Sequence, residues 1–97
     1  MVVIAMTNAP ESLRGELTKW MIEPKAGVLV GSVSALVRDK LWEKVCRQQD
    51  SVNGAVMIYT MNNEQGYMLR LHGDPQRTVE DFEGVQLIKF QENRQFF

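Results

Sequence analysis

The sequence has a single cysteine, Cys46, and a single histidine, His72, among its 97 residues. One cysteine can form neither an internal disulfide nor a cysteine-based zinc site, and so little cysteine suits a reducing compartment. No stretch approaches the ~18 consecutive apolar residues that cross a bilayer. The apolar start at residues 1–6 lacks the basic segment of a signal peptide. We therefore expect a cytoplasmic protein with no membrane partner.

Glycine-rich motifs and a strong net charge are also missing. The seven glycines are scattered singly, so the chain has no phosphate-binding loop and no dinucleotide fingerprint. The net charge of −1 gives no general attraction to nucleic acid, so any such contact must come from local clusters of the eleven Lys and Arg residues. Three acids at residues 80–83 are typical of a solvated loop. We predict no metal site from them.

What the chain does have is enough apolar content for one small domain. Domains of this length bury only about 60–65% of the surface that the unfolded chain exposes, so the core is thin. Apolar residues make up 44% of the sequence, which leaves surface for further burial between subunits. Residues 1–90 are expected to form the domain, followed by a tail at residues 91–97.

Apolar spacing predicts five strands and two helices. The strands are expected at residues 2–6, 28–30, 55–60, 67–72 and 85–90. Period 3.6 predicts a first helix over residues 10–23, ended by Pro24, and a second from Ser32 or Ser34 to about residue 49. The apolar stripe of the second helix contains Val33, Val37, Leu41 and Val45. A polar loop is expected between residues 73 and 84.

This order predicts an α+β fold with helices on one face of a mostly antiparallel sheet. A ferredoxin-like split βαβ arrangement is the natural candidate. That fold has two strands between its helices, whereas only residues 28–30 form a plain strand there. We therefore expect one bent strand in that connection.

Basic residues are the most suggestive functional feature. Arg14 is expected in the first turn of the first helix, where backbone N–H groups favour an anion. Lys25 follows that helix, Arg38 lies on the second helix, and Arg77 lies in the loop after the fourth strand. These residues could line a track of phosphate contacts. They could equally form a solvated charged face, which composition alone favours.

Several short motifs occur in a characteristic order. They are Thr-Asn-Ala-Pro at 7–10, Leu-Arg-Gly at 13–15, Lys-Ala-Gly-Val-Leu-Val-Gly at 25–31, Leu-Trp-Glu at 41–43 and Asp-Phe-Glu-Gly-Val-Gln-Leu at 81–87. With this order and spacing, the chain resembles the small adaptation subunit of type I-E CRISPR–Cas systems, the Cas protein numbered two. That subunit belongs to a family called CRISPR-associated endoribonucleases. The resemblance extends from residue 2 to about residue 90.

The resemblance implies a ferredoxin-like, symmetric homodimer that bridges two dimers of the larger Cas integrase during spacer acquisition in antiviral defence. The dimer would grip the backbone of a double-stranded DNA protospacer without reading its sequence. By position, Arg14, Lys25, Arg38 and Arg77 match the basic residues that touch phosphates. The segment from residue 85 to the end matches the part that docks on the integrase, with aromatic anchors at Phe90, Phe96 and Phe97.

The same family includes nucleases that use a divalent metal such as Mg²⁺. Their activity depends on an acid at the end of the first strand, paired across the dimer, because a hard cation needs carboxylate oxygens. This chain has Met6, Thr7 and Asn8 there, and its first acid is Glu11. We therefore expect a scaffold that needs no cofactor. The alternative is a Mg²⁺-dependent endoribonuclease or deoxyribonuclease, with Asn8 and Glu11 as the candidate catalytic residues.

Overall fold

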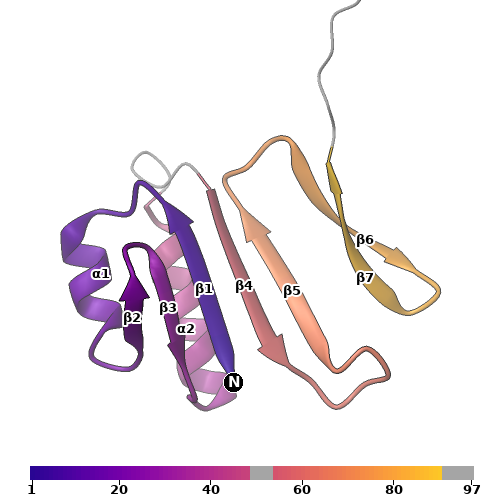
Figure 1. Cartoon of the computed structure of the whole chain (residues 1–97), viewed down its shortest axis with the longest axis horizontal. Coiled ribbons are helices and arrows are strands. Elements are labelled where there is room, and N and C mark those ends of the chain that lie inside the picture. Colours follow the sequence, from indigo (N-terminus) through magenta and orange to yellow (C-terminus); the bar gives the residue numbers. More distant parts are fainter. Residues whose placement is uncertain (49–53, 91–97) are drawn as a thin grey trace, which may run out of the picture.

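The computed structural model describes residues 1–48 and 54–90 (Figure 1). One five-stranded sheet, in the order β2-β3-β1-β4-β5, carries two helices, and a separate two-stranded sheet of β6 and β7 lies beside β5. The elements in chain order are β1 (Val2–Thr7), α1 (Glu11–Leu17), β2 (Ile22–Lys25), β3 (Val28–Gly31), α2 (Ala35–Cys46), β4 (Gly54–Thr60), β5 (Tyr67–His72), β6 (Arg77–Phe82) and β7 (Val85–Phe90).

The topology is that of a split βαβ unit used twice. Helix α1 connects β1 to β2 with β3 between them, and α2 connects β3 to β4 with β1 between them. Every strand pair in the described residues is antiparallel. The predicted α+β, ferredoxin-like fold with a mostly antiparallel sheet is therefore confirmed.

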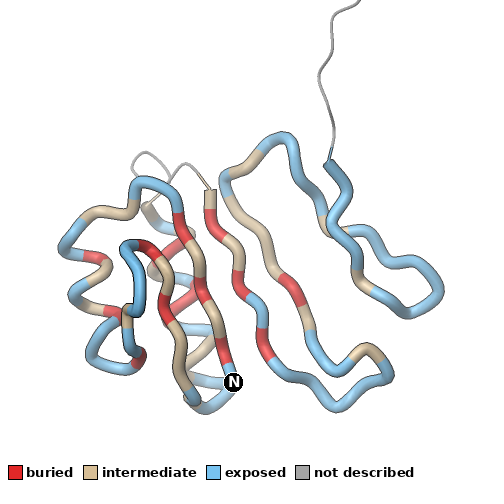
Figure 2. The backbone as a smooth tube through the Cα atoms, in the orientation of Figure 1, coloured by how far each residue is buried: buried red, intermediate tan, exposed pale blue. Residues whose placement is uncertain are grey.

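The core lies between the two helices and one face of the sheet. Along β1 the buried residues Val2, Ile4 and Met6 alternate with half-buried ones, as Figure 2 shows. Leu17 of α1 and Val45 of α2 are fully buried against the same face. Both helices therefore cover one side of the sheet, as the sequence predicted.

Helix α2 follows the predicted stripe closely. Leu41 and Val45 are buried, and Val33 and Val37 are half-buried against the core. The Ser34 hydroxyl accepts a hydrogen bond from the Val37 N–H (3.3 Å), which makes Ser34 the N-cap that the sequence offered beside Ser32. The helix ends at Cys46 rather than near residue 49, and residue 49 lies outside the described residues.

The predicted extent of the first helix was wrong, because α1 ends at Leu17. The chain keeps turning through hydrogen bonds from Trp20 N–H and Met21 N–H to the Leu17 carbonyl, which keeps Met21 buried at helical spacing. Trp20, however, is 54% exposed and adds nothing to the stripe. Residues 22–25 instead pair with β3.

The prediction of a single bent strand between the helices was also wrong. Strand β2 pairs antiparallel with β3, which gives the two strands that the fold requires. Pro24 lies within β2 rather than ending a helix. It is tolerated there because β2 is an edge strand, where one missing N–H donor need not interrupt the sheet.

Strand β6 was predicted as loop. It pairs with β7 through a two-residue turn at Glu83 and Gly84, whose φ angles of 52° and 85° are those of a tight hairpin turn. The Asp81 carboxylate accepts a hydrogen bond from the Gly84 N–H (2.9 Å) and supports the turn. The hairpin is tied to the main sheet by Gln86, whose side chain accepts from the Leu69 N–H (2.8 Å).

The opposite face of the sheet is apolar and carries no helix in the described residues. Residues that are directly paired on neighbouring strands have side chains on the same face of the sheet. Three central pairs therefore show which residues belong to this face. The pairs are Val3 with Val30, Val3 with Ile58, and Ile58 with Leu69. Separately, no helix in the described residues is both long and apolar enough to cross a membrane.

Candidate nucleic-acid interface

The turn between β2 and β3 packs against the end of β1. The Met6 N–H donates a hydrogen bond to the Gly27 carbonyl (2.8 Å). Gly27 is buried with φ of 82°, and a Cβ atom there would lie 2.5 Å from the Met6 carbonyl oxygen. Only glycine fits this position without displacing the backbone. The contact places the exposed Lys25, next to the turn, at the same end of the sheet as Asn8.

Glu23 of β2 joins this turn to helix α1. One carboxylate oxygen, Oε2, accepts hydrogen bonds from Arg14 Nε (2.8 Å) and from the Gly27 N–H (3.0 Å). The Gly27 N–H, more than Arg14, lowers the pKa of Glu23 below its ordinary value of 4.5. The Arg14 and Glu23 side chains are 31% and 18% exposed. Arg14 therefore belongs to a specific, half-buried ion pair. The prediction that it lies in the first turn was wrong, because the seven-residue α1 places it in the last turn, where its backbone N–H bonds to the Pro10 carbonyl.

A shallow hollow lies beside this ion pair. Its volume is about 300 Å³, and it is lined by Met6, Asn8, Ala9, Arg14, Ala26 and Gly27. Asn8 adopts a left-handed backbone conformation with φ of 58° as the chain leaves β1. Arg14 and the β2–β3 turn therefore line the same hollow.

Arg77 lies on the other side of the same end of β1. It begins β6, and its Nη1 donates to Asp74 Oδ2 (2.7 Å), which lowers the pKa of Asp74. A second hollow of about 230 Å³ is lined by both Thr7 and Arg77. Three of the four predicted phosphate-binding residues, Arg14, Lys25 and Arg77, thus gather around the end of β1.

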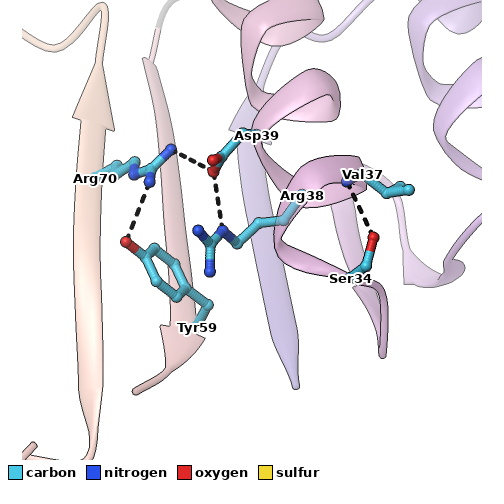
Figure 3. Close-up of polar contacts among 6 residues, drawn as sticks. All are labelled: Ser34, Val37, Arg38, Asp39, Tyr59 and Arg70. Atoms are coloured by element: carbon cyan, nitrogen blue, oxygen red, sulfur yellow. Dashed lines mark hydrogen bonds and ion pairs between the residues drawn. The ribbon is translucent and has the colours of Figure 1, made fainter. Parts of the chain in front are cut away.

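The fourth predicted residue, Arg38, lies elsewhere (Figure 3). Its guanidinium carbon is 3.9 Å from the centre of the Tyr59 ring, and its Nε donates to Asp39 Oδ1 (3.0 Å). Tyr59 pairs with Val2, at the beginning of β1, so Arg38 lies toward the opposite end of the sheet from Arg14. One protomer therefore does not bring all four residues into one patch.

Arg70 completes the cluster around Tyr59, and the sequence analysis did not select it. Its Nη1 donates to Asp39 Oδ1 (3.0 Å) and its Nη2 to the Tyr59 hydroxyl (3.2 Å), as Figure 3 shows. The hydrogen bond from Arg38 lowers the pKa of Asp39, and Arg70 lowers it by a smaller amount. A sequence signal for Arg70 did exist. Side chains alternate between the two faces along β5, and this alternation places Arg70 beside the buried Met57 on the face that the helices cover.

One carboxylate fixes each of Arg14 and Arg38 and leaves the terminal nitrogens of the guanidinium group without a protein partner among the described residues. Arg14 and Arg38 each bind a carboxylate through Nε and have no other hydrogen-bonding partner in the described residues. No buried side-chain nitrogen or oxygen in those residues lacks a partner, so their terminal nitrogens reach solvent. An oriented guanidinium that presents two N–H groups matches the geometry of phosphate oxygens.

The candidate catalytic residues do not form a comparable site. Asn8 and Glu11 are both exposed, and Glu11 lies in the first turn of α1. The structure adds the acid Glu23 near the end of β1, but its Oε2 already binds Arg14 and Gly27. Residues 1–48 and 54–90 contain no group of three or more His, Cys, Asp or Glu placed to hold a metal ion. This donor set does not fit Mg²⁺, which prefers carboxylate oxygens.

The predicted docking segment is described only in part. Phe90 ends β7 as an exposed residue, and the Arg77 guanidinium carbon lies 4.9 Å from the centre of its ring. Phe96 and Phe97 lie outside the described residues. The β6–β7 hairpin exposes further large apolar side chains at Phe82, Val85, Leu87 and Ile88.

Comparison with known families gives a match over most of the chain. Residues 1–87 match the family described as CRISPR-associated protein (Cas_Cas2CT1978). The matched region contains the whole five-stranded sheet, both helices and the start of β7. It also contains Arg14, Lys25 and Arg77 at the end of β1, together with the Arg38 cluster. The chain belongs to this family of CRISPR-associated, Cas2-like proteins.

Proposed function

We propose that this protein is a non-catalytic scaffold of CRISPR spacer acquisition that binds double-stranded DNA. As a homodimer it bridges dimers of the larger Cas integrase, as in type I-E systems, and grips the protospacer backbone. The observation that carries the proposal is the gathering of Arg14, Lys25 and Arg77 around the end of β1. Membership of a CRISPR-associated family supports the biological setting.

The local charge pattern suits backbone binding rather than sequence reading. The whole chain has a net charge of −1, so attraction to DNA must come from a local basic cluster such as the one at this end of the sheet. Carboxylates orient the guanidinium groups of Arg14 and Arg77. Contacts of this kind with phosphates fix the position of a duplex but carry no sequence information. A scaffold that accepts foreign DNA of any sequence needs this property.

The apolar sheet face supports the homodimer. It includes Val3, Val30, Ile58 and Leu69, and no described helix covers it. A second copy packed face to face would bury this surface and compensate for the thin core. Two-fold symmetry would also give each dimer two copies of the basic end of β1. A duplex could then be held at two places.

The test is duplex binding by the integrase complex assembled with variants of this chain. Arg14→Ala combined with Arg77→Ala should raise the Kd for a short DNA duplex at least tenfold, because charge-assisted contacts to phosphates are lost. The control is Lys19→Ala. Lys19 is an exposed lysine in the turn between α1 and β2, at the end of the sheet where β1 begins and opposite the proposed interface. Unchanged binding by the double variant would contradict the proposal.

A cleavage assay separates the scaffold from the nuclease alternative. The purified protein is incubated with RNA and duplex DNA in Mg²⁺ or Mn²⁺, and no specific cleavage is expected. Cleavage that disappears in Glu11→Gln or Asn8→Ala would replace the scaffold proposal with the metal-dependent nuclease.

A further inference from the structure

An acid lies among the residues proposed to hold phosphates. Glu23 is bonded to Arg14 and is 18% exposed, next to the hollow that Arg14 lines. A carboxylate at a phosphate-binding surface should repel the DNA backbone if charge alone decides its effect. Its hydrogen bonds indicate a different role.

The geometry divides the Arg14 guanidinium into two parts. Nε is engaged by Glu23 Oε2 at 2.8 Å, whereas the two terminal nitrogens have no protein partner in the described residues and reach solvent. Because the guanidinium is planar and rigid, a fixed Nε determines the direction in which the terminal N–H groups point. Glu23 thus leaves the phosphate-binding edge of Arg14 open.

The carboxylate is itself fixed. The same Oε2 accepts from the Gly27 N–H (3.0 Å), and Gly27 is held against β1 by the hydrogen bond from the Met6 N–H (2.8 Å). A chain of hydrogen bonds therefore runs from the central strand of the sheet to the Arg14 side chain. Without it, Arg14 would be a long, mobile side chain on a short helix.

We propose that Glu23 is a positioning residue, which orients Arg14 for a DNA phosphate and strengthens duplex binding in spite of its negative charge. This inference rests on the proposed function, in which Arg14 contacts the backbone. Orienting one long side chain in advance is worth about three- to tenfold in affinity, because the cost of immobilising it on binding is avoided. Removing a solvent-screened negative charge acts in the opposite direction, by about two- to threefold.

The opposite signs give a direct test with the integrase complex and a short DNA duplex. Glu23→Ala should raise the Kd by about two- to fivefold, the net of these two effects, although it removes an acid. Glu23→Gln should bind within about twofold of the unmodified protein or more tightly, because its amide oxygen can still accept from Arg14 Nε. The control Glu16→Ala removes an acid of α1 that pairs with Lys44. It should leave the Kd unchanged or lower it.

Arg14 variants test the inference without any change to Glu23. Arg14→Lys keeps the positive charge but lacks the rigid fork, so its Kd should rise nearly as far as that of Arg14→Ala. In the Arg14→Ala background, adding Glu23→Ala should not weaken binding further. Thermal unfolding of each variant verifies that the compared proteins are folded.

The contradicting results are distinct. If Arg14→Ala weakens binding while Glu23→Ala binds as tightly as the unmodified protein or more tightly, the positioning role is wrong and the scaffold proposal stands. Normal binding by Arg14→Lys would also overturn the positioning role. If Arg14→Ala itself binds normally, the proposed phosphate contact fails, and the inference fails with it.

Discussion

Replacing Gly27 with alanine should destabilise the protein by about 2–4 kcal/mol. A left-handed backbone conformation costs an L-residue about 1–2 kcal/mol, and the φ of 82° at Gly27 requires that conformation. The added Cβ would also lie 2.5 Å from the Met6 carbonyl oxygen, a backbone atom, so the turn must move away from β1. That movement breaks the hydrogen bond from the Met6 N–H, at a cost of about 1 kcal/mol.

Urea unfolding at a fixed protein concentration measures this loss as a lower midpoint with an unchanged m-value. Two other glycines serve as matched controls. Gly66 has φ of 87° but open space around it, so Gly66→Ala should cost only the conformational part, about 1–2 kcal/mol. Gly15 lies within α1 with nothing within 4 Å, so Gly15→Ala should stabilise the helix by about 0.5–1 kcal/mol. If Gly27→Ala costs no more than Gly66→Ala, the turn does not pack against β1 as described.

Three further predictions concern stability. Ser34→Ala should cost about 1 kcal/mol in chemical unfolding, because the Val37 N–H loses its capping acceptor; no change would remove Ser34 as the cap. Tyr59→Phe should cost about 0.5–1.5 kcal/mol, since Arg70 loses the hydroxyl while the ring under Arg38 remains, and Tyr59→Leu should cost more in the same assay. Stability should also fall in acid: the pKa of Glu23 is lowered from 4.5 and that of Asp39 from 3.8, so the unfolded chain binds more protons there. Their contribution is present above about pH 5 and is lost as the pH falls through the lowered values, and a pH series of unfolding midpoints that stays flat from pH 6 to pH 3 would contradict it.

The central elements of the fold could be predicted because each has a clear local pattern. Strand β1 is a short continuous apolar run, and α2 shows an i, i+4 stripe that begins after a capping serine. These local signals agree with the tertiary structure, since the α2 stripe packs on the same core as alternate residues of β1. The layered α+β arrangement follows from them.

The end of α1 and strand β6 could not be predicted, because their local sequence patterns indicated a longer helix and a loop. Met21 keeps helical spacing from Leu17 and is buried, yet it lies in a turn beyond α1, where hydrogen bonds continue without a helix. Strand β6 contains charged residues of low strand propensity, and it forms through pairing with β7. A Glu-Gly pair between Phe82 and Val85 was the one local hint of that hairpin.

The candidate site could be predicted by residue type but not by position. Arg14 and Arg77 were selected as basic residues, yet only the tertiary structure places both around the end of β1 and separates Arg38 from them. Glu23 gave no signal because its partner Arg14 is nine positions earlier in the chain. Contacts set by the packing of a hairpin against a strand leave no period in the sequence.

The salt dependence of duplex binding tests the central claim most directly. The Kd of the integrase complex for a short DNA duplex is measured from 50 to 200 mM salt, with the unmodified chain and with Arg14→Ala combined with Arg77→Ala. If each arginine neutralises one phosphate in each protomer, the double variant loses four phosphate contacts per dimer. The slope of the logarithm of the association constant against the logarithm of the salt concentration should then become shallower by about 3.6. Equal slopes for the two complexes would show that these arginines do not contact the DNA backbone, and would contradict the account.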